Sequence, residues 1–310
     1  ARLKRISSAR YEGRIIRILD STPRRLFGTV AAGRGGIVLQ QAERGGRDTI
    51  TLERNGDLPA SEGDLVEAEL LPRRGYLGKT ARIIDNLGPA DAPGAFSALA
   101  LAEFDIPHDF PDATIAETDG MKVPDPRGRT DLRDRPFVTI DGADARDFDD
   151  AVWAEKDGDG WHLIVAIADV SWYVRAGKPL DRDAFNRGNS VYFPDRVVPM
   201  LPEALSNGLC SLVPNKDRGC LAVHMWIDAE GNLKRHEFIR GIMRSAARLT
   251  YEQVQAARDG TTDNATSPLR DDVIAPLYDT FEALQSARIR RGTIDLDLPE
   301  RKVKLDRNGN

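Results

Sequence analysis

The chain has 310 residues, of which 41% are apolar and 30% charged, a composition that excludes a disordered protein. No apolar run reaches the ~18 residues that a membrane-spanning helix needs, and the N-terminal residues contain no hydrophobic stretch of the kind found in signal peptides. Cys210 and Cys220 are the only cysteines, which excludes a disulfide scaffold and a thiolate zinc site and fits a reducing cytoplasm.

Charge is distributed unevenly along the chain. Residues 1–90 hold 16 basic and 11 acidic side chains, a net charge of +5, whereas the remaining residues carry −10. A basic segment on an acidic body suggests a module that binds polyanions next to a part that handles cations. Chance unevenness explains the same numbers equally well.

The first part of the chain is rich in β-forming residues. Six short segments of this kind within about 80 residues predict a small closed barrel of the OB type over residues 10–88, with residues 1–9 as the tail of a preceding segment. The six expected strands are Tyr11–Leu19, Leu26–Ala32, Ile37–Gln40, Thr49–Glu53, Leu65–Leu71 and Gly78–Ile84.

Barrels of this type bind single strands with a basic groove and stacking aromatic rings. The aromatic part is thin here, because it consists of Tyr11, Phe27 and Tyr76. A purely structural OB-like or SH3-like barrel therefore remains the alternative. The basic part consists of Arg2, Lys4, Arg5, Arg10, Arg14, Arg17, Arg24, Arg25 and Arg34.

Residues 89–136 are expected to be a linker and connection. Gly88–Gly94 contains two prolines and two glycines and is typical of a linker. Ser97–Phe104 is predicted to form a short helix. Residues 107–136 are rich in Pro, Asp and Arg, which predicts an irregular connection.

A region with a different composition, predicted to mix strands and helices, begins at Arg135. A helix is predicted over Asp271–Arg291, with an apolar stripe of Ile274, Leu277, Phe281 and Leu284 and with Gly292 as its C-cap. Asp169 is expected to cap a turn and Cys210 to be a small buried hydrophobe. Strands are predicted at Phe137–Ile140, Ala151–Glu155 and Trp161–Ala168.

Between the first two of these strands, five carboxylates fall within ten residues: Asp141, Asp144, Asp147, Asp149 and Asp150. Two like charges 4 Å apart cost about 4 kcal/mol at an effective dielectric of about 20. A fold therefore keeps such a cluster only if it is splayed into water, shares protons or holds a hard cation.

The spacing is not that of an EF-hand calcium loop, because Arg146 stands where that loop has its glycine. An aspartic protease is disfavoured, since Asp141-Gly142 lacks the intervening hydroxyl residue. A loop that binds Mg²⁺ is therefore one interpretation. An exposed acidic turn, with Arg146 as its internal ion-pair partner, is an equally good one.

The segment Thr139–Val152, TIDGADARDFDDAV, resembles the signature of the RNB exoribonucleases, the ribonuclease II and ribonuclease R group. The sequence of Ala145–Asp150 resembles that of ribonuclease R more than that of ribonuclease II. The barrel then resembles this family's cold-shock domain, although Phe27-Gly28 is the only trace of its RNA-stacking motif. Further blocks follow in the family's order at Val165–Ser171, Asn186–Pro194, Pro199–Pro202, Leu205–Leu212 and Ala247–Tyr251.

The resemblance implies a catalytic metal site. Asp141 and Asp150 would be the principal ligands of Mg²⁺, which Mn²⁺ could replace, and Asp147 would support the same cluster. Asp149 would serve hydrolysis through a second metal or the attacking water. Tyr192 would stack on a base near the cleaved end, although a tyrosine between apolar neighbours is by itself more often a core residue.

Asp144 matches no ligand position of the family's motif. The family implies hydrolytic 3′→5′ degradation of single-stranded RNA with release of nucleoside 5′-monophosphates, by a protein that we expect to be a cytoplasmic monomer without membrane contact.

Residues 137–310 are expected to be the N-terminal part of the RNB catalytic domain, so that this chain alone would cleave RNA poorly. The alternative is a non-catalytic RNA-binding or chaperone fragment that acts through the OB barrel. A third, weaker reading is an acidic metal-binding protein unrelated to RNA.

Overall fold

The structure, a computed structural model, describes residues 2–5, 11–14, 25–33, 36–41, 50–53, 59–72 and 78–294, together with residues 296, 298, 299, 303 and 305. The chain divides into two compact units, which we describe separately. The first consists of Ala1–His108, Tyr192–Arg196 and Val303–Asn310, and the second of Asp109–Val191 and Val197–Lys302.

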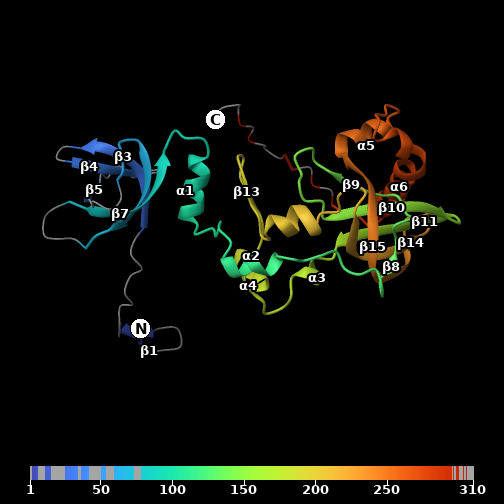
Figure 1. The fold of residues 1–310 in the computed structure, drawn as a ribbon, viewed down its shortest axis with the longest axis horizontal. Coiled ribbons are helices and arrows are strands. Elements are labelled where there is room, and N and C mark those ends of the chain that lie inside the picture. The colour runs from blue at the N-terminus through green and yellow to red at the C-terminus, as the bar shows by residue number, and fades with distance from the viewer. Residues whose placement is uncertain are drawn as a thin grey trace. The chain divides into compact units, whose positions relative to one another are not determined.

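A closed barrel of five strands forms the main part of the first unit (Figure 1). Its strands are β3 (Arg25–Gly33), β4 (Gly36–Gln41), β5 (Ile50–Glu53), β6 (Asp64–Leu70) and β7 (Thr80–Pro89). They follow one another around the barrel in the order β3-β4-β5-β7-β6, so that β3 pairs with both β4 and β6. Apolar side chains from all five strands fill the interior, which confirms the predicted closed barrel.

The predicted strand Tyr11–Leu19 does not belong to this barrel. β1 (Arg2–Arg5) and β2 (Tyr11–Arg14) pair with each other in a separate antiparallel sheet, with Arg2 opposite Arg14. The barrel closes without β2 because β3 pairs directly with β6. Residues 15–19 lie outside the described residues, as do Arg10, Arg17, Arg24, Arg34 and Tyr76 of the expected RNA-binding set.

Arg25 of that set is engaged within the first unit. Its guanidinium forms ion pairs with Glu67 on β6 and with Asp105, and it donates a hydrogen bond of 3.2 Å to the carbonyl oxygen of Ala102. The same guanidinium lies over the ring of Phe27, 5.5 Å from its centroid. Arg25 and Phe27 therefore contribute to packing within the unit.

Helix α1 (Ala95–Glu103) follows the barrel and confirms the helix predicted at Ser97–Phe104. In the second unit, α2 (Asp112–Thr118) and β8 (Thr130–Asp131) lie where the composition predicts an irregular connection, so that prediction is wrong there. Asp112 in the first turn of α2 favours the helix dipole, and Pro111 before it has no N–H that would need a helical partner.

The second unit is built on a six-stranded sheet in the order β14-β11-β10-β9-β15-β8, and β14 also pairs with β15. β9 runs parallel to β15, with Asp141 opposite Thr250, whereas β10 and β11 are antiparallel to their neighbours. Besides β8, the strands are β9 (Phe137–Asp141), β10 (Asp150–Asp157), β11 (Gly160–Ala168), β14 (Asp217–Ile227) and β15 (Leu233–Thr250). The three strands predicted in this region are confirmed.

The helices and short elements of this unit lie between and after the strands, and of the hairpin strands β12 and β13 only Tyr192 is assigned to the first unit. None of the helices in the described part of the chain is long and apolar enough to cross a membrane. In chain order they are α3 (Val170–Tyr173), α4 (Pro179–Arg187), the hairpin β12 (Val191–Tyr192) and β13 (Val197–Val198), η1 (Ala204–Leu209), α5 (Tyr251–Arg258), η2 (Ser267–Leu269), η3 (Arg270–Ile274) and α6 (Ala275–Arg290).

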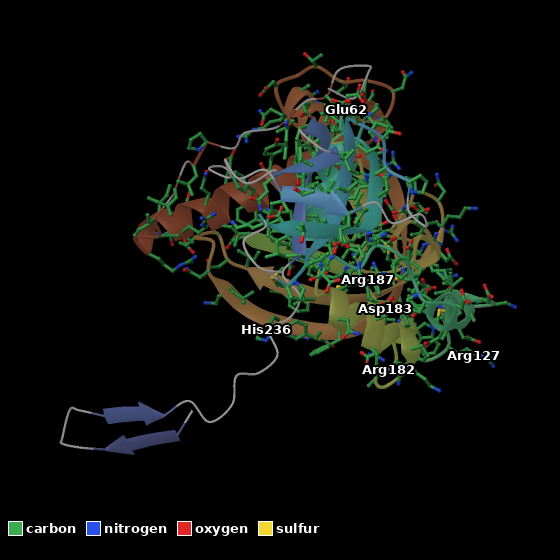
Figure 2. All side chains as sticks on the ribbon, turned by 90° about the vertical axis from the view of Figure 1, so that its left-hand side faces the viewer. Glu62, Arg127, Arg182, Asp183, Arg187 and His236 are labelled. Atoms are coloured by element: carbon green, nitrogen blue, oxygen red, sulfur yellow. The ribbon has the colours of Figure 1, made fainter. Side chains whose placement is uncertain are left out.

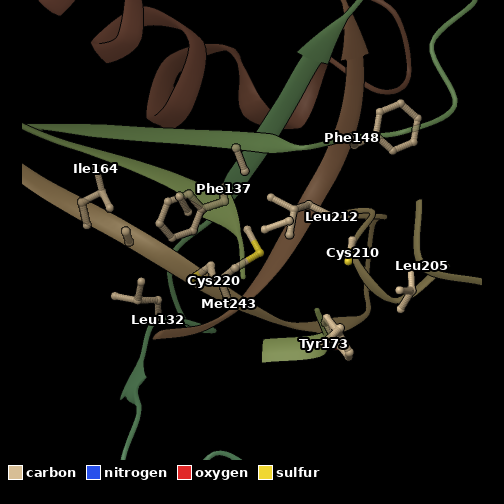
Figure 3. Packing of buried hydrophobic residues seen from close by; sticks show 14 of the residues in the cluster. Leu132, Phe137, Phe148, Ile164, Tyr173, Leu205, Cys210, Leu212, Cys220 and Met243 are labelled. Carbon is tan, nitrogen blue, oxygen red and sulfur yellow. The ribbon is translucent and has the colours of Figure 1, made fainter. Parts of the chain in front are cut away.

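Both faces of the sheet are packed. Neighbouring strand residues point to opposite faces, so Phe137 and Val138 of β9 belong to different clusters. Phe137 is buried with Met243 and Leu212 in the larger cluster (Figure 3). Val138 packs in the other cluster, to which α5, η3 and α6 contribute side chains.

Helix α4 is anchored through Arg187, whose side chain is 2% exposed. Arg187 pairs with Asp183 one turn earlier at 3.2 Å, and both residues are labelled in Figure 2. Its Nη2 atom donates to the carbonyl oxygen of Asp109 at 2.6 Å, and the guanidinium lies over the ring of Phe110. These contacts fix α4 against the segment that precedes α2.

The helix predicted over Asp271–Arg291 begins differently, because the π-helical turn η3 leads into α6. The predicted apolar stripe is wrong at Phe281, which is 47% exposed. The buried residues of α6 are instead the smaller Thr280, Ala283 and Ala287. The glycine C-cap is confirmed, since Gly292 follows the helix with a φ of 72°.

Candidate active site

The segment with the crowded carboxylates, Asp141–Asp150, connects β9 to β10, and we call it the aspartate loop. Asp141 is the last residue of β9 and lies opposite Thr250 of β15. Asp150 is the first residue of β10 and lies opposite Ile167 of β11. The two ends of the loop are therefore fixed by strands of one sheet.

The second half of the loop is held by backbone hydrogen bonds around the buried ring of Phe148. The Phe148 N–H donates to Oγ of Ser211 at 3.1 Å, and the Leu212 N–H donates to the carbonyl oxygen of Phe148 at 2.8 Å. The Ala168 N–H donates to the carbonyl oxygen of Asp149 at 2.8 Å. This anchoring fixes where the Asp147 and Asp149 side chains begin.

The carboxylates of the loop act on one another. Burial raises the pKa of Asp141, the charges of Asp150 and Asp147 raise it further, and Arg248 opposes them. The pKa of Asp149 is also raised, first by burial and then by Asp147, Asp150 and Asp141. Asp149 still meets solvent, but the protein atoms packed around it withhold enough water to disfavour its charge.

The four predicted site aspartates thus lie near enough for their charges to influence one another, and Asp144 is not among the neighbouring charges that raise these two pKa values. Oδ2 of Asp141 is buried and has no hydrogen-bond partner among the described residues. A buried carboxylate oxygen in that condition is costly unless a cation or a proton satisfies it.

A metal site would need ligands around a common point. In the described part of the chain, no three His, Cys, Asp or Glu side chains are arranged in that way. What fits a hard cation here is the donor chemistry, four carboxylates without a thiolate or an imidazole, together with the unpartnered oxygen of Asp141.

Tyr192 is the last residue of β12 and belongs to the first unit. Its side chain is 64% exposed, so the reading of Tyr192 as a core residue is wrong. Cys210, by contrast, is buried as predicted, and burial raises the pKa of its thiol to about 12.

Two features of this region are not apparent from the sequence pattern. Asp169 does not serve as a turn cap through its side chain but is fully buried in an ion pair with Arg129. Arg248 of β15 contacts the aspartate loop, more than 100 residues away in sequence. Arg248 lies within the block Ala247–Tyr251, and this block is the one sequence signal that could have drawn attention to it.

Comparison with known proteins identifies the two parts of the chain. The pattern of the RNB domain matches residues 129–310, and that of the cold shock domain matches residues 42–111. Ribonuclease R of Vibrio parahaemolyticus is 41% identical over 305 residues, which cover 94% of this chain and 36% of that protein. The chain thus spans about a third of the length of this curated relative.

Solved structures share the fold. The structure of Mycoplasma genitalium RNase R in complex with double-stranded RNA matches with a TM-score of 0.84 at 24% identity, covering 95% of this chain and 53% of that one. Yeast Ssd1, a pseudonuclease, matches with a TM-score of 0.64 at 15% identity, covering 93% and 37%. The chain therefore belongs to the RNB family, in the ribonuclease R group, with a cold-shock domain ahead of its RNB domain.

Proposed function

We propose that these residues belong to a Mg²⁺-dependent exoribonuclease that hydrolyses single-stranded RNA from its 3′ end and releases nucleoside 5′-monophosphates. The observation that carries the proposal is the aspartate loop of an RNB domain, where neighbouring carboxylates raise the pKa values of Asp141 and Asp149 and where Oδ2 of Asp141 is buried and unpartnered among the described residues.

In this proposal Asp141 and Asp150 hold Mg²⁺, with Mn²⁺ as a substitute, and Asp147 supports them. The bound cation would lower the pKa of a water molecule and balance the charge that develops on the phosphate. Asp149 orients the attacking water or holds a second cation. Water forms a new bond to the terminal phosphorus, the bond to the 3′ oxygen of the preceding nucleotide breaks, and that oxygen takes up a proton.

The raised pKa of Asp149 supports its part in this chemistry. A carboxyl group whose charge is disfavoured by burial and by three like charges gains most from a nearby cation. Asp149→Asn keeps the size of the side chain and removes this charge.

A non-catalytic RNA-binding protein is the alternative, and one observation favours it: the same fold occurs in Ssd1, which is described as a pseudonuclease. In that reading the cold-shock barrel binds RNA through its basic residues and the RNB fold does not turn over. The pKa values of Asp141 and Asp149, which burial and the neighbouring carboxylates raise, weigh against it, since RNA binding alone does not call for such crowded acidic side chains.

The deciding experiment incubates the intact protein, as the cell makes it, with single-stranded RNA labelled at the 5′ end or throughout. With the 5′-labelled RNA we expect a Mg²⁺-dependent ladder that shortens from the 3′ end. With the RNA labelled throughout we expect labelled nucleoside 5′-monophosphates. Asp149→Asn should abolish release and leave RNA binding intact, because phosphate contacts are spread over other residues.

Asp144→Asn is the matched control, a change of the same kind in the same loop, and it should cleave at the wild-type rate. Asp141→Asn and Asp150→Asn should raise the Mg²⁺ concentration needed for half-maximal activity. RNA binding without any Mg²⁺-dependent release would favour the non-catalytic reading. The proposal includes a monomer that acts in the cytoplasm, in keeping with the free, buried Cys210 and Cys220.

A further inference from the structure

Arg248 contacts the aspartate loop at three points. Its Nη2 atom donates hydrogen bonds of 3.0 Å to the carbonyl oxygens of Ala143 and Ala145. Its guanidinium carbon lies 4.7 Å from the centroid of the Phe148 ring. All three contacts fall between Asp141 and Asp149, so one side chain of β15 spans the part of the loop that carries the carboxylates.

We propose that Arg248 is a positioning residue, which holds the backbone of residues 143–148 so that the aspartate carboxylates converge on one cation. The inference rests on the proposed function, because Arg248 is inferred to arrange the carboxylates that the proposed function assigns to cation binding.

The sheet determines where Arg248 starts. β15 runs parallel to β9, and Arg248 stands opposite Thr139, two residues before Asp141. Its side chain therefore leaves the sheet next to the end of β9 from which the loop departs. A planar guanidinium can donate to two carbonyl oxygens and lie on an aromatic ring at once, which a lysine ammonium cannot do.

The first half of the loop has few other attachments. The Ala145 N–H donates to the carbonyl oxygen of Gly142 at 3.1 Å, a contact within the loop itself. Among the described residues, we find no hydrogen bond from Ala143 or Ala145 to the sheet other than those of Arg248. Without the Arg248 contacts, repulsion among the carboxylates would move this part of the loop and separate the carboxylates.

Arg248 supplies positive charge without occupying the carboxylates. Among the described residues it forms no ion pair within 4.0 Å, and its Nη2 atom donates to carbonyl oxygens. Arg248 thus holds the loop through its backbone and the Phe148 ring, without an ion pair of its own to the loop carboxylates.

The test uses the purified chain and three variants. Arg248→Met removes the charge and the donors, Arg248→Lys keeps the charge alone, and Arg244→Met is the matched control. Arg244 is another exposed arginine of β15, but it pairs with Asp217 and not with the loop. Mn²⁺ affinity is measured by electron paramagnetic resonance, amide exchange over residues 142–150 by mass spectrometry, and stability by thermal unfolding.

We expect Arg248→Met to weaken Mn²⁺ binding by about 10–100-fold, the usual loss when a group that orients metal ligands is removed. Amide exchange over residues 143–148 should accelerate, while the unfolding midpoint should match that of Arg244→Met. Arg248→Lys should bind Mn²⁺ with intermediate affinity and exchange as fast as Arg248→Met, because it keeps the charge and loses the geometry.

Slow exchange in Arg248→Met, equal to that of the wild type, would overturn the inference. So would Mn²⁺ affinity in both Arg248 variants equal to that of Arg244→Met. If the wild-type chain itself bound no Mn²⁺, the metal part of the proposed function would be contradicted, and the exchange measurement would still decide whether Arg248 holds the loop.

Discussion

The Nη2 atom of Arg129 lies 2.7 Å from Oδ2 of Asp169, and the two side chains are only 6% and 0% exposed. Arg129 also donates to the carbonyl oxygen of Gly241 on β15, and Ser171 donates to the second oxygen of Asp169. A buried ion pair, supported by two further hydrogen bonds, therefore joins the segment before β8 to the end of β11.

We predict that Arg129→Met lowers the free energy of unfolding of the second unit by about 3–5 kcal/mol, because it leaves the buried Asp169 charge with only the half-exposed Arg240, 4.0 Å away, as a cationic partner. Urea unfolding followed by tryptophan fluorescence measures this selectively, since all four tryptophans lie in the second unit. Arg127→Met is the control: Arg127 is 91% exposed in its pair with Asp125, and its loss should cost less than about 0.5 kcal/mol. Equal losses in both variants would contradict the prediction.

The same pair predicts a pH dependence. Burial would raise the pKa of Asp169, but hydrogen bonds from Arg129 and Ser171 outweigh it, and the pKa is lowered. A lowered pKa contributes stability that is present above the unfolded value of about 3.9 and is lost as the pH falls through the folded value. Asp169→Asn should therefore be less stable than the wild type at pH 7, and the difference should shrink as the pH falls below about 4. A difference that stayed constant down to pH 2 would show that the charge of Asp169 does not stabilise the fold.

Asp149 should behave in the opposite way in metal-free protein. Its pKa is raised by burial and by three neighbouring carboxylates, so the ionised form opposes folding at neutral pH. Asp149→Asn should accordingly raise the urea midpoint at pH 7 in the presence of a chelator, whereas Asp144→Asn should leave it unchanged. Added Mg²⁺ should reduce the advantage of the variant, because a ligand that binds the folded wild type stabilises it. A lower midpoint in Asp149→Asn would contradict the unfavourable charge.

Under the proposed function, with Tyr192 stacking on a base near the cleaved end, Tyr192→Ala should change where degradation stops more than whether it proceeds. A stacked base contributes about 1–3 kcal/mol, enough to alter the hold on the last nucleotides and too little to remove the hydrolytic chemistry. The sizes of the end products on a sequencing gel measure this. Tyr192→Phe keeps the ring and should leave the ladder unchanged, while an unchanged ladder in Tyr192→Ala would exclude the stacking role. Because the side chain is 64% exposed, neither change should lower stability appreciably.

The sequence was sufficient to predict elements whose own residues determine them. Trp161–Ala168 is an apolar run bounded by a turn, and it lies within β11. Helix α2 was missed because its seven residues lie in a stretch rich in Pro and Asp. Phe281 was assigned to the buried stripe by its spacing alone, but the packing partners of α6 place smaller residues against the rest of the unit.

In the candidate site, too, the local residues could be predicted and their distant partners could not. The aspartates could be identified from a local motif, since they fall within ten residues of one another. The partners that arrange them come from distant segments: Ser211 and Leu212 hold Phe148, and Arg248 holds Ala143 and Ala145. Spacing along the chain carries no information about such contacts, because β9 and β15 meet only in the folded sheet.

The parallel pair of β9 and β15 can form only after the ribosome has synthesised β15. The barrel strands are complete at Pro89, whereas the strand that flanks Asp141 ends at Thr250. Ribosomes add about 5–20 residues per second, so roughly 8–32 s separate the two events. During that interval the nascent polypeptide can contain a folded barrel, but Asp141 still lacks the strand beside it. Under the proposed function, the aspartate loop would therefore acquire its complete surroundings in the sheet only after residue 250 has been synthesised.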